Sequence, residues 1–197
     1  AMVNRALADI AKSLTRPGAD IAALADVVQG HALAMTGSRY GYVSSIDPEG
    51  GDLVSHTLSS MMSAAHCMVR DKRIAFPMRE DGTYGGLYGC SLNTCKPMYT
   101  NDPVSHPSSQ GLPEGHVPIE RFLAVPAVFE GKLMGQIALA NPQRDYNEDD
   151  LEAVGALANL FAMAVFRMRA EDDLRRARDE AAAANHAKSE FLANMSH

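Results

Sequence analysis

Cysteine is scarce in this chain and tryptophan is absent: the 197 residues include three Cys and no Trp. Cys67, Cys90 and Cys95 form an odd, sparse set without C-x-x-C spacing, which excludes a disulfide framework and argues against a zinc site. A reducing cytoplasm is therefore the expected location. The eleven methionines are typical of an adaptable core and, less often, of an adaptable binding surface.

Positive charge is also in short supply. The formal net charge is −6 and the pI is near 5.6, which excludes the basic face that a nucleic-acid-binding protein needs. The sequence shows no apolar run of the roughly 18–20 residues that span a membrane, and its first ten residues lack the layout of a secretion signal. A chain of this length fits one domain of about 150 residues with an appendage.

The first half of the chain alternates between helix and strand signals. After Pro17-Gly18, apolar residues at helical spacing predict an amphipathic helix that ends at Gly37. Two strand-like runs, 39–47 and 52–60, flank the Gly-rich turn at 48–51 and predict a hairpin. "RIAFPM" predicts a short strand, and a glycine-rich loop then enters a short helix that must end before Pro97.

The second half begins with the least regular part of the chain. Residues 101–120 hold four prolines and two histidines, so we expect a long irregular loop of the kind that often serves function. "RFLAVPAVFE" and "LMGQIALAN" around the turn "GK" predict a second hairpin. Asn147 is the expected N-cap of a final helix. Only Gly155 interrupts the following fifty residues, whose length as a helix would be about 75 Å.

Three stretches of this sequence resemble the GAF domain family. "GGLYGCSLNTCKPMYTNDP" is similar to the helix–strand passage of that family, "RFLAVPAVFEGKLMGQIALAN" to its signature hairpin, and "YNEDDLEAVGALANLFAMAV" to its closing helix. The resemblance implies an α+β fold in which helices flank a central antiparallel sheet. It divides the chain into a helical lead-in (1–19), a GAF sensor domain (20–168) and a coiled-coil connector (169–197).

The last ten residues, "KSEFLANMSH", resemble the H-box of sensor histidine kinases. That resemblance implies that the chain is a piece of such a kinase and that His197 is its phosphoacceptor. A neutral imidazole nitrogen of this histidine would attack the γ-phosphorus of ATP. Because the ATP-binding domain that follows in the family is not in the sequence, we expect no kinase activity from this fragment alone.

The charged, Ala-rich part of the final helix is seldom stable by itself, so we expect it to form a dimeric coiled coil with a second copy. One heptad position holds Leu174, Ala181, Lys188 and Met195, and a second holds Glu171, Arg178, Asn185 and Leu192. These two positions form the seam, the surface along which the two helices would meet, and its polar residues weaken the pairing. The seam is interpreted either as a switch between two packings or as an exposed linker.

The expected function is that of a cytoplasmic sensor module. A small ligand in the GAF pocket would change how the C-terminal helices of the two copies pack. That change would alter the access of the kinase domain to His197. In the parent protein, the partners would be an ATP-binding domain and the receiver domain of a response regulator, with no nucleic acid and no membrane. Because the family often carries its ligand between the irregular loop and the sheet, the candidate polar contacts are Asn101, Asp102, His106, His116 and Arg121. The candidate apolar wall consists of Met68, Phe76, Met78, Tyr84 and Leu87.

Three alternatives stay open at this point. The GAF core could be a ligand-free structural dimerisation module. It could be a haem- or metal-binding redox sensor, with His56, His66 or His106 as candidate haem ligands, although no metal site and no cofactor are identified. It could also be an enzyme, since free methionine sulfoxide reductases use a GAF fold with three cysteines, although their cysteine spacing differs from that found here.

Overall fold

The computed structural model describes residues 2–14, 20–57, 75–112 and 116–195, with side chains described from residue 3 up to Phe191. The chain consists of two compact units, Ala1–Val165 and Phe166–His197, which are taken separately below. The first unit contains the sheet and most of the helices. The second is the distal part of the last helix.

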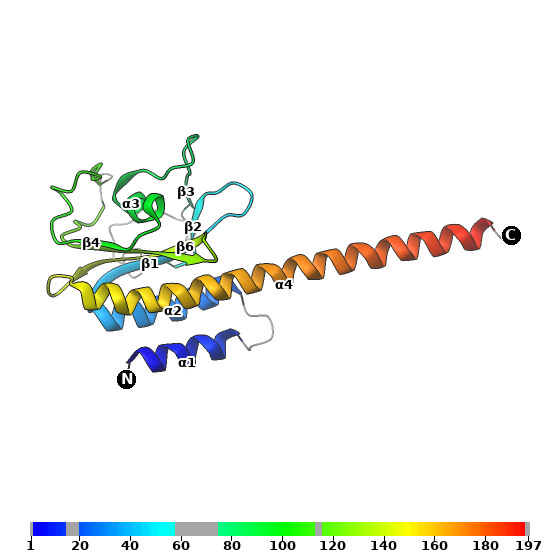
Figure 1. Cartoon of the computed structure of the whole chain (residues 1–197), viewed down its shortest axis with the longest axis horizontal. Helices are drawn as coiled ribbons and strands as arrows, with labels where there is room; N and C mark the ends of the chain where they lie inside the picture. Colours follow the sequence, from blue (N-terminus) through cyan, green and yellow to red (C-terminus); the bar gives the residue numbers. More distant parts are fainter. Residues whose placement is uncertain (1, 15–19, 58–74, 113–115, 196–197) are drawn as a thin grey trace. The chain divides into compact units, whose positions relative to one another are not determined.

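The first unit is built on a six-stranded antiparallel sheet in the order β3-β2-β1-β6-β5-β4 (Figure 1). The long central strands pair from Ser38↔Pro142 to Ser45↔Gly135 and from Phe122↔Ala140 to Phe129↔Lys132. The strands are β1 (Ser38–Ile46), β2 (Leu53–Ser55), β3 (Ala75–Phe76), β4 (Met98–Thr100), β5 (Phe122–Phe129) and β6 (Lys132–Pro142). Both predicted hairpins, the short strand before Pro77 and the irregular region after β4 are therefore confirmed.

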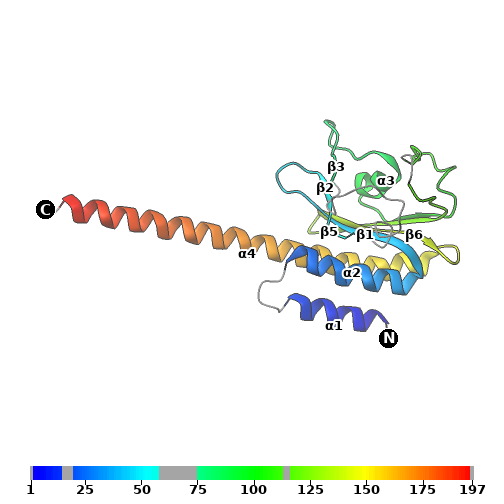
Figure 2. The same ribbon diagram turned by 180° about the vertical axis from the view of Figure 1, so that it is seen from behind.

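Helices cover both faces of this sheet. Helix α2 (Ile21–Thr36) and α4 (Glu148–Met195), in its part up to Val165, lie along one face, and α1 (Met2–Leu14) packs on the outside of α2 (Figures 1 and 2). Helix α3 (Gly86–Thr94) lies on the other face. Because side chains alternate along a strand, each strand contributes to two separate layers.

The main core fills the layer between the sheet and α2 and α4. Strand residues such as Val43, Ile137 and Leu139 are no more than 1% exposed, as is Phe161 of α4. Gly41 of β1 leaves room for Leu139 of β6 and Leu33 of α2, since a Cβ there would lie 2.6 Å from Leu139 Cδ2 and 3.3 Å from Leu33 Cδ2. A larger residue at this position would require both leucine side chains to move.

The predicted ends of α2 are confirmed. Asp20 Oδ1 accepts a hydrogen bond from the Ala23 N–H at 2.6 Å, which satisfies one of the free donors of the first turn. Gly37 takes the left-handed conformation, with φ of 67°, and so ends the helix as a glycine C-cap does.

The turn of the second hairpin lies one residue earlier than predicted. Phe129 pairs with Lys132, so the loop is Glu130-Gly131 rather than Gly131-Lys132. Both loop residues have positive φ, 49° and 76°, which is the conformation of a type I′ turn. Glu130 accepts this strained conformation because the strands on either side require a two-residue loop.

The long final helix is also confirmed: α4 runs for 48 residues. Its N-cap is Asn147, as predicted, whose Oδ1 accepts from the Asp150 N–H while the Asp150 carboxylate accepts from the Asn147 N–H, both at 3.1 Å. Arg144 adds two hydrogen bonds to the same carboxylate, at 2.6 and 2.7 Å. This reciprocal arrangement is a capping box with Asp in place of Glu.

The composition of α4 corrects one expectation. Residues Glu148–Phe191 include an 18-residue window with a mean hydropathy of 1.5, which is long and apolar enough to cross a membrane. In the protein, 39% of that window is buried, and the buried side chains include Val154, Leu157 and Phe161. The prediction that no such segment exists was therefore wrong, because a helix that covers a sheet needs the same apolar side chains.

The second unit, taken alone, is a solvent-exposed helix. Every residue from Ala170 to Phe191 is exposed, and ion pairs such as Arg167–Glu171 at 2.7 Å and Arg175–Asp172 at 2.9 Å join neighbouring turns. Such exposed pairs stabilise a helix by only about 0.2–0.5 kcal/mol each. The predicted coiled coil with a second copy stays a prediction.

Candidate functional site

Three aromatic side chains gather on the face of the sheet that carries α3. The Tyr42 and Phe76 rings stack, with centroids 5.5 Å apart and an interplanar angle of 26°. The Tyr88 ring of α3 lies 4.8 Å from the Phe76 ring at 45°. Leu53, Tyr84 and Leu92 form the buried cluster against which these rings pack. We call the Tyr42, Phe76 and Tyr88 rings the aromatic trio.

A buried amide at the centre of the same face joins the sheet to α3. Gln136 of β6 is fully buried. Its Oε1 accepts from the Tyr42 hydroxyl at 2.9 Å, and its Nε2 donates to the Tyr88 carbonyl and to Ser91 Oγ, both at 2.7 Å. Because a buried amide without partners is costly, these bonds set the position of α3 above the sheet.

Burial governs the acid–base behaviour of the tyrosines on this face. Desolvation, with a smaller contribution from Tyr88, raises the pKa of the Tyr42 hydroxyl far above its ordinary value. Desolvation also raises the pKa of Tyr84 and of Tyr88, and the Arg79 guanidinium partly offsets the effect on Tyr88. At neutral pH, Tyr42 is thus a neutral hydrogen-bond donor to Gln136.

The loop before α3 is held by Tyr84 and Asn93. The Tyr84 hydroxyl donates to the Gly51 carbonyl at 2.5 Å, and the Asn93 side chain binds both the Tyr84 N–H and the Tyr84 carbonyl, at 2.8 and 2.9 Å. Gly89 faces this loop, and a Cβ there would lie 2.2 Å from the Tyr84 carbonyl oxygen. The glycine therefore permits α3 to pack against its own N-terminal loop.

A second apolar cluster continues the face toward β4. Its floor is Phe122, Ala124 and Ala138, and the half-buried Leu87, Tyr88, Met98 and Ile119 pack against it together with Tyr42. The two alanines leave room for larger side chains from the covering layer. Tyr42 and Tyr88 belong to both clusters, so the aromatic trio borders a continuous apolar surface.

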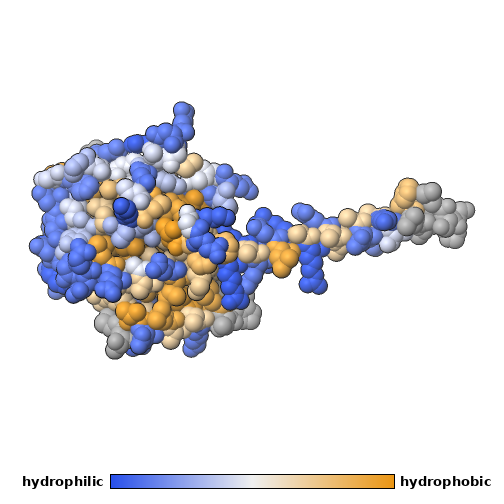
Figure 3. All heavy atoms as spheres, viewed as in Figure 1, coloured by the Kyte–Doolittle hydropathy of each residue, from blue (hydrophilic) through white to orange (hydrophobic). Residues whose placement is uncertain are grey.

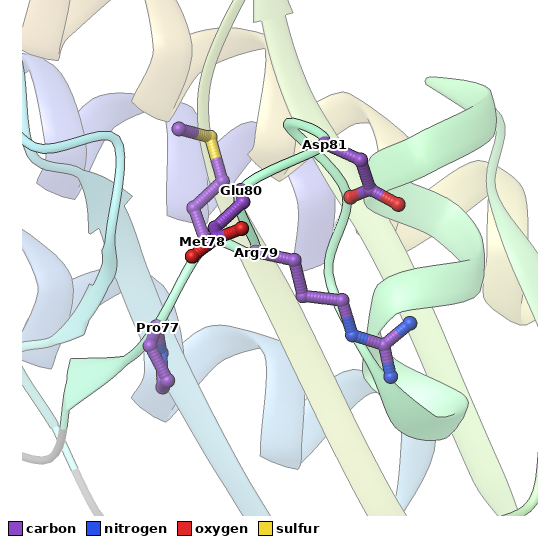
Figure 4. Close-up of a pocket in the computed structure, with 5 residues that line it drawn as sticks. All are labelled: Pro77, Met78, Arg79, Glu80 and Asp81. Atoms are coloured by element: carbon purple, nitrogen blue, oxygen red, sulfur yellow. The ribbon is translucent and has the colours of Figure 1, made fainter.

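A shallow groove of about 580 Å³ lies next to this face, along Pro77, Met78, Arg79, Glu80 and Asp81 (Figure 4). Arg79 Nη2 lies 2.6 Å from the position of a Cβ on Gly85, at the start of α3. Hydrogen bonds from both the Thr83 hydroxyl and the Thr83 N–H lower the pKa of Asp81. The groove is open to solvent and presents one guanidinium and two carboxylates.

The structure brings the described residues of the predicted apolar wall close together, but not the predicted polar contacts. Phe76, Tyr84 and Leu87 lie in or against the two clusters on the α3 face, and Met78, which is 38% exposed, lines the neighbouring groove. The polar candidates do not converge. Asn101 binds the backbone of Tyr146, and Arg121 Nε donates to Asp145 Oδ1 at 2.7 Å.

The other polar candidates are engaged within the irregular loop. Asp102 accepts a hydrogen bond from the Ser105 N–H, and Ser105 holds the pKa of this carboxyl low. His106 Nδ1 accepts from the Ser108 N–H at 3.1 Å. His116 Nδ1 lies 2.7 Å from the Val117 carbonyl oxygen. Their role as ligand contacts stays a prediction.

Several predicted residues lie outside the described part of the chain, namely His66, Cys67, Met68 and His197. Of the candidate haem ligands that are described, His56 Nε2 is 2.8 Å from Ser45 Oγ. Cys90 is half-buried and Cys95 is exposed, and both are free thiols. Among the described residues, no group of His, Cys, Asp and Glu has the arrangement of a metal site.

Sequence reasoning missed the central residues of this face, which are Tyr42, Tyr88, Ser91 and Gln136. Each lies within a stretch whose secondary structure was predicted. Strand alternation could have placed Tyr42 and Gln136 on one face, but a glutamine in an otherwise apolar strand was the only available signal. The link from Gln136 to Ser91 joins residues that lie 45 positions apart.

Comparisons with known proteins agree on one family. Residues 18–165 match the family described as GAF domain. A methyl sulfide methyltransferase-associated sensor from Methanosarcina acetivorans is 30% identical over 187 residues, which cover 90% of this chain and 18% of that protein. The chain thus spans less than a fifth of this relative's length.

Solved structures share the fold at low sequence identity. The GAF domain of a phosphoenolpyruvate-protein phosphotransferase from Coxiella burnetii has a TM-score of 0.68 at 18% identity and covers 87% of this chain and 96% of that one. A free methionine-R-sulfoxide reductase from Neisseria meningitidis, in complex with its substrate, has a TM-score of 0.62 at 15% identity, with coverages of 86% and 91%. At such identities the likeness shows the fold alone.

Proposed function

The chain belongs to the GAF domain family, and from that membership we propose that it is the signal-sensing module of a two-component sensor histidine kinase. The relative from Methanosarcina acetivorans is itself named a sensor, which supports a sensing role. The histidine kinase part of the proposal rests on the terminal "KSEFLANMSH".

The observation that carries the sensing role is the combination of the aromatic trio with Gln136. Stacked or tilted aromatic rings offer faces for a flat or apolar ligand, and polar groups beside them can orient it. A ligand that contacts Phe76 and Tyr88 would act on α3, because Gln136 ties α3 to β6. The proposed ligand is therefore a small molecule with an apolar or aromatic part.

The first test is native mass spectrometry of the freshly purified protein with an absorption spectrum of the same sample. A bound mass that disappears on denaturation supports the sensor, and a Soret band would identify haem. A protein that carries no adduct and shows no thermal shift with any compound of a metabolite library would favour the structural dimerisation module. Turnover of free methionine sulfoxide with a thiol reductant would favour the reductase instead.

A matched pair of variants places the ligand. Phe76→Ala removes one ring of the aromatic trio, whereas Val54→Ala shortens a side chain on the adjacent strand, where strand alternation directs it to the opposite face. Ligand affinity should fall in the first variant and persist in the second. Equal affinities in both variants would place the ligand elsewhere.

The proposed output is phosphorylation of His197 in the parent protein. An imidazole nitrogen would attack the γ-phosphorus of ATP held by a kinase domain, and ADP would leave. A receiver domain of a response regulator would then take the phosphoryl group. We place this protein in the cytoplasm, as a homodimer through its C-terminal helix, and the free thiols of Cys90 and Cys95 are compatible with a reducing compartment.

The kinase proposal is tested on the full-length natural protein that contains this chain. Incubation with labelled ATP should give an alkali-stable, acid-labile phosphate, which His197→Gln abolishes. His186→Gln is the matched control, since His186 is a histidine of α4 whose side chain is 77% exposed. Label that survives in His197→Gln would overturn the assignment.

A further inference from the structure

Among the described residues of the second unit, two large apolar side chains are exposed. Leu174 is 71% exposed and Phe191 is 62% exposed, and Figure 3 shows hydrophobic residues set between hydrophilic ones along this part of α4. Leaving such side chains in water forgoes the free energy of burying them. They therefore mark the face of the helix that a partner is expected to cover.

The spacing of these two residues defines that face. Phe191 follows Leu174 by two heptads and three residues, so if Leu174 is at position a of a heptad, Phe191 is at position d. The a and d positions between them hold small residues and one lysine, namely Ala177, Ala181, Ala184 and Lys188. This set differs from the seam predicted from the sequence, which left Phe191 outside and placed Glu171, Arg178 and Asn185 inside.

Charges beside the seam favour one orientation of the partner. With Leu174 at a, Asp173 is at position g and Arg178 at the following position e. In a parallel pair, residue g of one helix faces the following e of the other, so Asp173 and Arg178 attract each other across both sides. In the described part of the chain, the ion pairs of this helix join other residues and leave Asp173 and Arg178 unpaired.

The composition of the seam also indicates its strength. Ala177, Ala181 and Ala184 allow the two helices to approach closely but bury little apolar area. Lys188 at position a is the kind of residue that specifies register and two-chain assembly at a cost in stability. The expected pair is therefore weak and sensitive to changes at either end.

We propose that residues 174–191 pair in parallel and in register with the same segment of a second copy of this chain. The facing residues are Leu174, Ala177, Ala181, Ala184, Lys188 and Phe191, and Asp173 of each copy pairs with Arg178 of the other. This inference rests on the homodimer of the proposed function and adds its surface, direction and register.

Cysteine crosslinking of the intact 197-residue chain tests direction and register. Ala177→Cys places a thiol in the seam, and Ala182→Cys is the matched control at the neighbouring outward position b, both in a background with the native cysteines changed to Ser. Mild oxidation should link two copies through Cys at 177 at least about tenfold faster than at 182, because only seam residues come within disulfide distance. Equal rates would overturn the register.

Charge exchange supplies a second, independent readout. Asp173→Arg and Arg178→Asp should each weaken dimerisation about tenfold in sedimentation equilibrium, and the double exchange should restore it, since the attraction then reverses its sign. Asp179→Arg makes the same charge change at the outward position f and should have little effect. A double exchange no better than the single changes would overturn the proposed pairing.

The two experiments separate this inference from the proposed function. A chain that is dimeric in native mass spectrometry but does not crosslink through position 177 keeps the dimer and rejects this seam. A chain that is monomeric at every concentration rejects both the seam and the homodimer. Ligand binding on the α3 face would be unaffected by either result.

Discussion

The side chain of Asn101 holds the backbone of Tyr146 from both sides. Its Oδ1 accepts from the Tyr146 N–H at 2.9 Å, and its Nδ2 donates to the Tyr146 carbonyl at 3.1 Å. Asn101 follows β4, and Tyr146 directly precedes the N-cap of α4. The contact therefore fixes the point at which the sheet passes into its longest helix.

Tyr146 extends this connection to α2. Its ring is 2% exposed, and its hydroxyl lies 2.7 Å from Ser38 Oγ, which in turn lies 2.6 Å from Thr36 Oγ1. The Thr36 hydroxyl donates to the Ala32 carbonyl of α2 at 2.8 Å. Through these hydrogen bonds, a displacement of β4 would move the start of α4 and the end of α2.

The first prediction concerns this contact. Asn101→Ala removes two hydrogen bonds from the Tyr146 backbone and should lower the free energy of unfolding by about 1–3 kcal/mol. Asp102→Ala, one residue further along, removes an exposed carboxylate whose hydrogen bond to Ser105 lies within the irregular loop, and should lower the free energy of unfolding less. Urea denaturation of both variants measures the difference, and equal stabilities would show that the Asn101 contact contributes nothing.

The second prediction concerns the cap of α4. Asp150→Ala removes the acceptor for the Asn147 N–H and for Arg144, and should cost about 1–2 kcal/mol. Asp149→Ala is the matched control, since Asp149 is exposed in the same helical turn. Thermal and urea unfolding should rank the two variants in that order. The reverse order would contradict the capping role.

The third prediction contrasts two glycines in helices. Gly30 of α2 has open space around it, so Gly30→Ala should stabilise the protein by about 0.5–1 kcal/mol through helix propensity. Gly89→Ala makes the same change in α3, but its Cβ would lie 2.2 Å from the Tyr84 carbonyl oxygen. It should destabilise the protein by about 1–3 kcal/mol. Changes of the same sign in both variants would argue against the tight packing at Gly89.

The fourth prediction concerns alkaline pH. Burial raises the pKa of Tyr42 and of Tyr146 above the ordinary value of 10.0. Below pH 10 both tyrosines are protonated in the folded and unfolded states. As pH rises above 10, the unfolded tyrosines lose protons that the folded ones keep, so stability should fall by about 1.4 kcal/mol per pH unit for each tyrosine.

Tyr42→Phe isolates one of these two contributions. The variant is expected to be less stable than the natural protein at neutral pH, because Gln136 loses its donor. Its stability should then fall less steeply above pH 10, since one titrating group is gone. Urea midpoints between pH 8 and 11 measure both slopes, and parallel slopes would show that Tyr42 does not control the alkaline loss.

The sequence by itself determined most of the secondary structure. Local signals sufficed where the physical cause is local, as in the left-handed Gly37 that ends α2 and the Asn147–Asp150 cap that starts α4. The type I′ turn was displaced by one residue because strand register, and not the preference of Gly131 alone, decides which two residues form the loop. The sequence pattern predicted the polar helix, and the proposed seam lies on the face that carries its two large apolar side chains, Leu174 and Phe191.

The tertiary structure decided which residues meet. Asn101 and Arg121 were predicted as ligand contacts because the resembled family often carries its ligand between the irregular loop and the sheet. In the structure, Asn101 binds Tyr146 and Arg121 binds Asp145. Gln136 reaches Tyr88 and Ser91 only because β6 and α3 are stacked. Hydrogen bonds over such sequence distances depend on how layers pack, and that packing is a property of the whole chain, whereas caps and turns depend on a few neighbouring residues.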